Sequence, residues 1–270
     1  MKEAAIKTRI LTACIVLPLL IAFILWTPFW GFFGFVGLVC GWGLLEFFAM
    51  AYAQRRFGET LLGLALGLAL MVFAALGWHA AFIGCLTASL FGVACCFLIR
   101  HGNMQTVAGE LSLLLFGVLY VSLPLAHLAM LRGLPHGVRW IFLVLLMVML
   151  NDTCAYFTGS FLGRHKLYPS VSPNKSVEGA IGGLAGSILA AGIAHLTFVP
   201  WPGLGFLLLL GLVAGAVAEL GDLFESLLKR SFGVKDSGSM IPGHGGILDR
   251  LDSLLFVFPL TYYFALTFQG

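Results

Sequence analysis

The sequence predicts an all-α, polytopic integral membrane protein with about nine transmembrane helices and a cytoplasmic N-terminus. Three observations lead to this prediction. Only 10% of the 270 residues are charged, whereas a soluble domain carries about 25%. Hydrophobic residues make up 60% of the chain. Long apolar runs recur along it, and a run of about 18 or more residues is typical of a helix that crosses a bilayer.

The apolar runs are continuous, whereas the strands of a membrane β-barrel are short and alternate in polarity. Helices also satisfy their own backbone hydrogen bonds, as lipid requires. Lys2, Lys7 and Arg9 precede the first run. The length of that run and the lack of a cleavage site after it favour a retained helix over a signal peptide. The nine expected helices are 10–28, 30–50, 60–77, 79–99, 110–131, 138–158, 179–199, 204–225 and 247–268.

The distribution of lysine and arginine between the loops predicts the orientation. With the N-terminus in the cytoplasm and nine helices, all but Arg132 and Arg139 of the 15 basic residues fall on the cytoplasmic side, in accord with the positive-inside rule. This bias explains the net charge of +3, which therefore indicates no nucleic-acid partner. The six cysteines form no C-x-x-C pattern, and we interpret them as small buried hydrophobic residues.

The ionisable residues are unevenly distributed along what we interpret as a single membrane domain, 1–270. Residues 1–150 form the N-terminal helices, and residues 151–270 form the predicted catalytic half. Two polar loops, 151–183 and 219–253, dominate this half, and both are expected on the cytoplasmic side. Eight of the 12 acidic residues lie within 151–253, namely Asp152, Glu178, Glu219, Asp222, Glu225, Asp236, Asp249 and Asp252.

Two acidic residues of the N-terminal helices have simple interpretations. Glu46 lies toward the end of the second run, where its side chain can reach the membrane interface. Glu110 begins the fifth run, and a carboxylate there suits the dipole at a helix N-terminus. Neither residue is predicted to belong to a site.

Polar side chains follow a helical spacing in the second polar loop. Carboxylates three and four residues apart share one helix face and repel each other unless a cation lies among them. Carboxylates near a membrane interior usually mark a functional site, and Mg²⁺ is commonly bound by one or two of them together with substrate phosphate. The alternative is a set of salt bridges to Lys229, Arg230 and Arg250. The residues with this spacing are Glu219, Asp222, Glu225, Ser226 and Lys229, followed by Asp249 and Asp252.

The glycine-rich segment "PGHGG", 242–246, precedes the last expected helix. Glycine lets a ligand approach the backbone, and the N–H groups of a helix N-terminus favour anions. The segment is not a P-loop, because G-x-x-x-x-G-K-[ST] does not occur. His244 can contact phosphate or tune a carboxylate, or it is structural. The basic residues available for phosphate are Lys229, Arg230, Lys235 and Arg250.

The first polar loop contains "SPNKS", 172–176, before a glycine-rich helix. Ser172 or Ser176 can cap that helix, and Lys175 can reach a phosphate. Asn151 and Asp152 lie at the expected end of the preceding helix, where they either terminate it or bind substrate.

The segment "SLLKRSFGVKDSGSMIPGHGGILDRLD", 226–252, resembles the signature of the phosphatidate cytidylyltransferase family, the CDP-diacylglycerol synthases. "NDTCAYFTG" and "SPNKSVEG" in the first loop also resemble this family, although Ser176 is more often threonine there. Every fixed position of the signature is filled, by Ser226, Lys229, Arg230, Lys235, Asp236, His244, Gly245, Gly246, Asp249, Arg250 and Asp252.

The resemblance implies a multi-pass enzyme of the bacterial inner membrane with its active site facing the cytoplasm. Such an enzyme transfers the cytidylyl group of CTP to phosphatidate, giving CDP-diacylglycerol and pyrophosphate for phospholipid biosynthesis. It also implies dependence on Mg²⁺, with K⁺ as a cation that can share the centre, membrane lipids as surroundings, and a homodimer.

The resemblance further implies roles for individual residues. Asp222 and Asp249 are expected to bind the metal and, with Lys229 and Arg250, to form the catalytic group. The expected substrate-binding residues are Asn151, Asp152, Ser172, Asn174, Lys175, Ser176, Glu178, Ser226, Arg230, Lys235, Asp236, His244, Gly245, Gly246 and Asp252.

Two other classes of protein remain open from the residues. One is a related CTP-using enzyme, either a prenol-type lipid kinase or a cytidylyltransferase for an ether lipid. The other is an anion transporter. Transporters often have repeated halves and broken helices near the midplane, whereas the charges here gather at one face of one half, which argues against transport.

Overall fold

The computed structural model describes residues 18–52, 56–100, 104–238 and 245–268. The chain forms two compact units, which are described separately. The first unit comprises Met1–Ala129 and Asp236–Asp249, and the second comprises Met130–Lys235 and Arg250–Gly270. Residues 236–238 and 245–249 of the predicted signature therefore belong to the same unit as the N-terminal helices.

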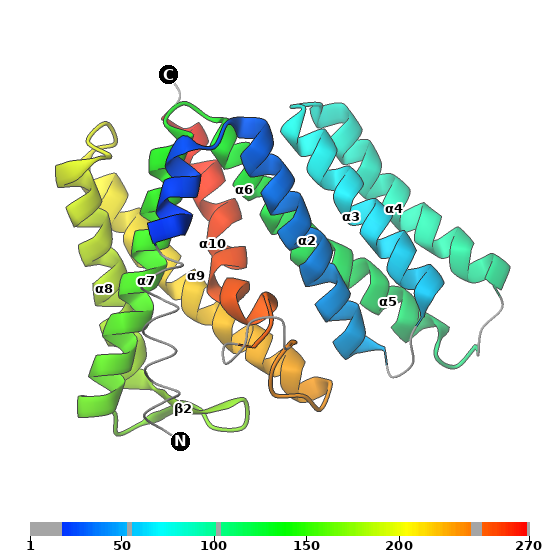
Figure 1. Ribbon diagram of the computed structural model, residues 1–270. Coiled ribbons are helices and arrows are strands. Elements are labelled where there is room, and N and C mark those ends of the chain that lie inside the picture. The colour runs from blue at the N-terminus through cyan, green and yellow to red at the C-terminus, as the bar shows by residue number, and fades with distance from the viewer. Residues whose placement is uncertain (1–17, 53–55, 101–103, 239–244, 269–270) are drawn as a thin grey trace. The chain divides into compact units, whose positions relative to one another are not determined.

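The first unit is built from α2 (Phe29–Ala51), α3 (Phe57–Ala75), α4 (His79–Arg100) and α5 (Val107–Gly117), followed by a π-helical turn, η1 (Val118–Ser122), and the larger part of α6 (Leu123–Gly133). Helix α3 packs against α2, α4 and η1 (Figure 1). The core of this unit is apolar, and its fully buried side chains include Leu44, Phe47, Leu70, Met71 and Leu114.

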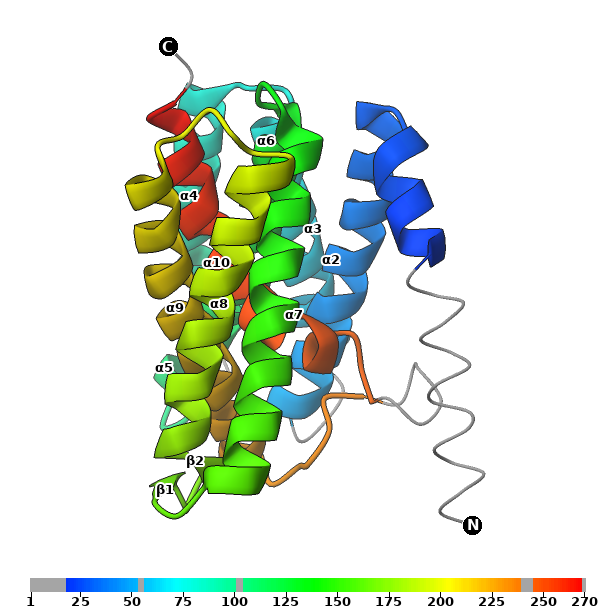
Figure 2. The ribbon, with the colours of Figure 1, turned by 90° about the vertical axis from the view of Figure 1, so that its left-hand side faces the viewer.

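The second unit contains α7 (Gly137–Leu162), a short hairpin of β1 (Lys166–Tyr168) and β2 (Ser172–Ser176), then α8 (Val177–Thr197), α9 (Leu204–Ser231) and most of α10 (Leu248–Leu266). Helix α8 packs against both α7 and α9. Figure 2 shows these helices side by side, with the hairpin at one end of α7 and α8. The strands pair antiparallel, with Lys166 opposite Ser176.

Glycines on α8 allow the close approach of α7 and α9. A Cβ on Gly186 would lie 2.5 Å from the backbone oxygen of Leu150, and one on Gly179 would lie 3.0 Å from that of Ala155. On α9, a Cβ on Gly211 would lie 2.8 Å from the backbone oxygen of Ser187. Small residues at such interfaces let helices pack where lipid supplies no hydrophobic driving force between them.

The all-α, polytopic fold expected from the sequence is confirmed. Seven helices in the described part of the chain are long and apolar enough to cross a membrane. Helix α10 is formed as expected, but it is not one of these seven helices. Its first turn carries charged residues, including Asp249 and Arg250. Residues 18–26 are helical and the rest of the expected first helix lies largely outside the described residues. Nine helices, the cytoplasmic N-terminus and the single-domain organisation stay predictions.

Two local expectations were wrong, and one local feature was not foreseen. Helix α7 continues to Leu162, so Asn151 and Asp152 lie inside it and do not terminate it. Helix α9 continues to Ser231, beyond the expected end at 225. The polar loop between α7 and α8 contains a hairpin that the sequence did not indicate. Both helices were cut short because apolarity alone defined their expected ends.

Candidate functional site

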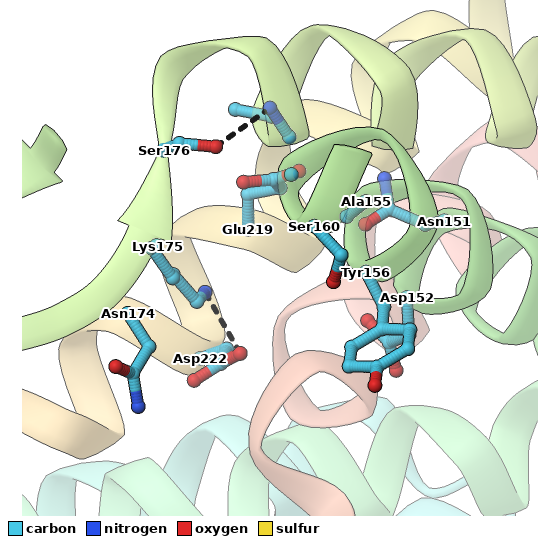
Figure 3. A pocket seen from close by; sticks show the side chains of 13 residues that line it. Asn151, Asp152, Ala155, Tyr156, Ser160, Asn174, Lys175, Ser176, Glu219 and Asp222 are labelled. Atoms are coloured by element: carbon cyan, nitrogen blue, oxygen red, sulfur yellow. Dashed lines mark hydrogen bonds and ion pairs between the residues drawn. The ribbon is translucent and has the colours of Figure 1, made fainter. Parts of the chain in front are cut away.

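A cavity of about 480 Å³ lies within the second unit, between α7, the β2–α8 junction and α9. Figure 3 shows side chains from all three segments around it. Residues of both predicted polar loops therefore meet at one place. The cavity-lining residues that the sequence singled out are Asn151, Asp152, Asn174, Lys175, Ser176, Glu219 and Asp222.

An ion pair joins the hairpin to α9 across this cavity. Lys175 Nζ lies 2.7 Å from Asp222 Oδ2, and the two side chains are 23% and 31% exposed. The dashed line between Lys175 and Asp222 in Figure 3 marks this pair. Ser226, one turn further along α9, donates a long hydrogen bond of 3.5 Å to Asp222 Oδ1. Lys175 and Asp222 thus lie where a ligand can reach both.

Carboxylates outnumber the lysine in this region. Asp152 interacts electrostatically with Asp252, Asp222, Lys175 and Glu219. Glu219 Oε1 is buried and receives no hydrogen bond from the described part of the chain. Lys229 also acts on Asp252 but forms its ion pair with Glu225, so the four carboxylates keep an excess of negative charge, which a cation would neutralise.

The donors of this cluster fit Mg²⁺. Mg²⁺ prefers oxygen ligands and usually takes one or two carboxylates while keeping waters or substrate phosphates. No group of three or more His, Cys, Asp or Glu side chains forms a ready metal site within the described residues. A metal site with one or two protein carboxylates, completed by substrate phosphates, agrees with the ligand preference of Mg²⁺ and with the lack of a larger cluster among the described residues.

Asn151 is held deep in the second unit. The residue is only 1% exposed. Its Nδ2 donates to Ser187 Oγ at 3.2 Å and to the backbone oxygen of Gly215 at 3.4 Å. Ser187 Oγ donates in turn to the backbone oxygen of Met147 at 3.1 Å. A buried amide needs such partners, so this network fixes α7 against α8 and α9 beneath the cavity.

The β2–α8 junction has mainly local hydrogen bonds. Ser176 Oγ accepts from the N–H of Gly179 at 3.1 Å, which confirms the expected helix cap. Glu178 accepts from the N–H groups of Arg164 and His165 at 3.0 and 3.2 Å, so it secures the start of the hairpin. Glu178 and Ser172 are not among the residues that line the cavity, and their roles in substrate binding stay predictions.

The basic residues near the end of α9 differ in their surroundings. Lys229 Nζ lies 2.5 Å from the buried Glu225 carboxylate, as the salt-bridge alternative anticipated for this pair. Arg230, Lys235 and Arg250 are exposed. Their predicted contacts with phosphate remain predictions.

The signature residues Asp236, Gly245, Gly246 and Asp249 belong to the first unit, whereas Ser226 and Asp252 belong to the second. Asp249 Oδ2 accepts from the backbone N–H groups of Ser237 and Gly246 at 2.9 and 2.8 Å. Gly245 has a φ of +80°, a conformation that glycine adopts at little cost. Asp236 is exposed, and His244 lies outside the described residues. Asp222 and Asp249 belong to different units, so their expected pairing at one metal stays a prediction.

Sequence reasoning missed several polar residues. Glu46 is 6% exposed and accepts hydrogen bonds from Ile247 and Leu248, so the expectation that it reaches the membrane interface was wrong. Its signal was present, because a carboxylate within an apolar helix usually marks a function. Tyr156 and Ser160 line the cavity. They follow Asp152 by four and eight residues, which places all three on one face of α7.

The chain belongs to the cytidylyltransferase family, whose model matches residues 7–268. Curated bacterial relatives named phosphatidate cytidylyltransferase are similar to it. The protein of Bacillus subtilis (strain 168) is 41% identical over 162 residues, 59% of this chain and 60% of the relative. That of Staphylococcus aureus (strain COL) is 51% identical over 126 residues, 46% and 48% of the two chains. The matches thus span about half to three fifths of the relatives' lengths.

Proposed function

We propose that this protein transfers the cytidylyl group of CTP to phosphatidate, giving CDP-diacylglycerol and pyrophosphate, at the cytoplasmic face of the bacterial inner membrane. Membership of the cytidylyltransferase family and the names of the bacterial relatives support the reaction class. The observation that carries the proposal is the cavity in which Lys175 and Asp222 form an ion pair among further carboxylates, within a bundle of membrane helices.

Charge neutralisation is the main task for such a site. CTP and phosphatidate are both anions and repel each other as they approach. Lys175 can exchange its contact with Asp222 for a phosphate oxygen, because its ammonium group has three donors. Hydrogen bonds between charged groups are shorter and stronger than neutral ones. Binding of the triphosphate would thus release the Asp222 carboxylate for another cation.

We propose Mg²⁺ as that cation, with K⁺ as a second cation that can share the centre. Within the second unit, Asp222 and Asp152 would hold Mg²⁺, and Asp249 is its expected ligand from the signature. When bound, the metal supplies positive charge to the phosphate oxygens and to the pyrophosphate as it departs. The half-buried Glu219 carboxylate, whose Oε1 is buried, adds to the negative charge of the same cavity.

The chemical step needs no protein nucleophile. A phosphate oxygen of phosphatidate attacks the α-phosphorus of CTP and forms a new P–O bond. The bond from the α-phosphorus to the bridging oxygen breaks, and pyrophosphate leaves with the electron pair. The chain's contribution is to orient the two phosphates in line and to neutralise their charge. Asn151 and Ser187 support this by holding α7 and α8 in register.

The decisive experiment follows the label of CTP. Purified protein in detergent is supplied with phosphatidate, Mg²⁺ and CTP labelled at the α-phosphate. We expect label in the lipid phase and an equal amount of pyrophosphate. Asp222→Asn should abolish the transfer, whereas Glu59→Gln, which changes a buried carboxylate of α3 in the first unit, should retain it.

The opposite result is equally clear. No label in lipid from intact protein, with Mg²⁺ and K⁺ both varied, would reject phosphatidate as the acceptor. Transfer from γ-labelled CTP to a prenol would then identify a lipid kinase. The proposed homodimer is tested separately, by the mass of the detergent-solubilised protein in light scattering.

A further inference from the structure

Glu46 of α2 makes contacts that the proposed reaction does not explain. Its carboxylate is buried in the first unit, where Oε1 accepts from the N–H of Ile247 and Oε2 from the N–H of Leu248, both at 3.0 Å. Ile247 directly precedes α10 and Leu248 is its first residue, and the N–H groups at the start of a helix have no partner within that helix. A carboxylate is favoured there by the helix dipole. Glu46 therefore caps α10 from 202 positions away in the sequence.

Ser237 connects Glu46 to Asp249. Its hydroxyl oxygen lies 3.1 Å from Glu46 Oε2 and 3.0 Å from Asp249 Oδ2, and it also accepts from the N–H of Asp249 at 3.3 Å. A serine hydroxyl has one hydrogen, so it donates to one carboxylate at a time. Its backbone N–H donates to Asp249 Oδ2 in either case. Ser237 thus holds both carboxylates in place.

The glycines of this segment leave space for the two carboxylates. A Cβ on Gly238 would lie 2.6 Å from Glu46 Oε1, and a Cβ on Gly245 would lie 2.5 Å from Asp249 Oδ2. A Cβ on Gly246 would collide with Ser237 Oγ and with Glu46 Oε2. The backbone on both sides of the 239–244 segment therefore closes around Glu46 and Asp249.

We infer that Glu46 is a positioning residue that orients Asp249 for the bound cation. It holds the start of α10 and, through Ser237, contacts the group that binds Asp249 Oδ2, so that the Asp249 carboxylate keeps one orientation. This inference rests on the proposed function, which gives Asp249 its metal. Residues that support metal ligands commonly contribute about 10–100-fold in metal affinity or activity.

The test uses the full-length protein in detergent and Mn²⁺ alone as the probe. Mn²⁺ binding is measured by electron paramagnetic resonance on the monodisperse fraction of wild type and variants. Glu46→Gln keeps the shape of the side chain but turns an NH₂ toward one of the two backbone donors. We expect it to weaken Mn²⁺ binding by about tenfold or more. The matched control is Glu59→Gln, a residue that is 3% exposed and pairs with Arg56; it should bind Mn²⁺ as wild type does.

Ser237→Ala provides a second variant that is less disruptive to folding. It removes only the hydroxyl between Glu46 and Asp249, and we expect weaker Mn²⁺ binding with a smaller drop in melting temperature than in Glu46→Gln. Amide hydrogen exchange of Ile247 and Leu248 should accelerate in Glu46→Gln, because the cap is lost. A purely structural Glu46 would lower the yield of folded protein and leave Mn²⁺ affinity unchanged in both variants, and that result would overturn the inference.

Activity of the wild type separates the two hypotheses. Weaker Mn²⁺ binding in both variants, with a wild type that transfers no cytidylyl group, would reject the proposed reaction and support the positioning role. Unchanged Mn²⁺ binding in variants of an active enzyme would reject the positioning role alone. A wild type that binds no Mn²⁺ would overturn the positioning role whatever its activity.

Discussion

Gly186 of α8 offers the sharpest test of how the second unit packs. A Cβ at this position would lie 2.5 Å from the backbone oxygen of Leu150 and 2.9 Å from Cys154 Cβ. A backbone oxygen cannot rotate away, so α7 and α8 must separate. Overpacking costs about 1–3 kcal/mol, and a collision with backbone belongs at the upper end. Replacing glycine by alanine inside a helix gains about 1 kcal/mol, so Gly186→Ala should lower the free energy of unfolding by about 2 kcal/mol.

Gly192 supplies a control on the same helix. A Cβ there would lie 3.7 Å from Leu208 Cδ2, which is an ordinary contact, so Gly192→Ala should raise the free energy of unfolding by up to about 1 kcal/mol. Unfolding of both variants in mixed detergent micelles, followed by tryptophan fluorescence, measures the difference. Because Leu150 precedes Asn151, Gly186→Ala should also reduce cytidylyl transfer. Equal stability of the two variants would refute the close packing of α7 and α8.

The remaining predictions concern the cavity. Lys175→Gln should lower cytidylyl transfer by about tenfold or more, because it removes a charged donor worth about 1.5–3 kcal/mol. The control, Lys166→Gln on the exposed strand β1, should not lower it. Equal rates of transfer in the two variants would exclude Lys175 from the site. Ser176→Ala should lower the free energy of unfolding by about 1 kcal/mol through loss of the α8 cap, and an unchanged unfolding midpoint would contradict that role. Chelation by EDTA should abolish transfer and added Mg²⁺ should restore it, measured with α-labelled CTP; activity that persists in EDTA would argue against the metal.

The sequence by itself determined the class of fold and the family. In lipid, a span must be apolar and must satisfy its own backbone, so each helix is visible in a local run of residues. The Ser176 cap was also predictable, since it depends on residues three positions apart. The signature near α10 could be recognised without coordinates, because it is a contiguous segment.

Only the tertiary structure decided which polar residues meet. Lys175 and Asp222 come from different polar segments, and Glu46 reaches the start of α10 across 202 positions. No periodic pattern records such pairings, because they depend on how helices pack. Asn151 shows the same limit. Its sequence position suggested a helix end, yet α7 continues because Ser187 and Gly215 satisfy its amide within the bundle. A buried polar group is stable only with such partners, and those partners are defined in space.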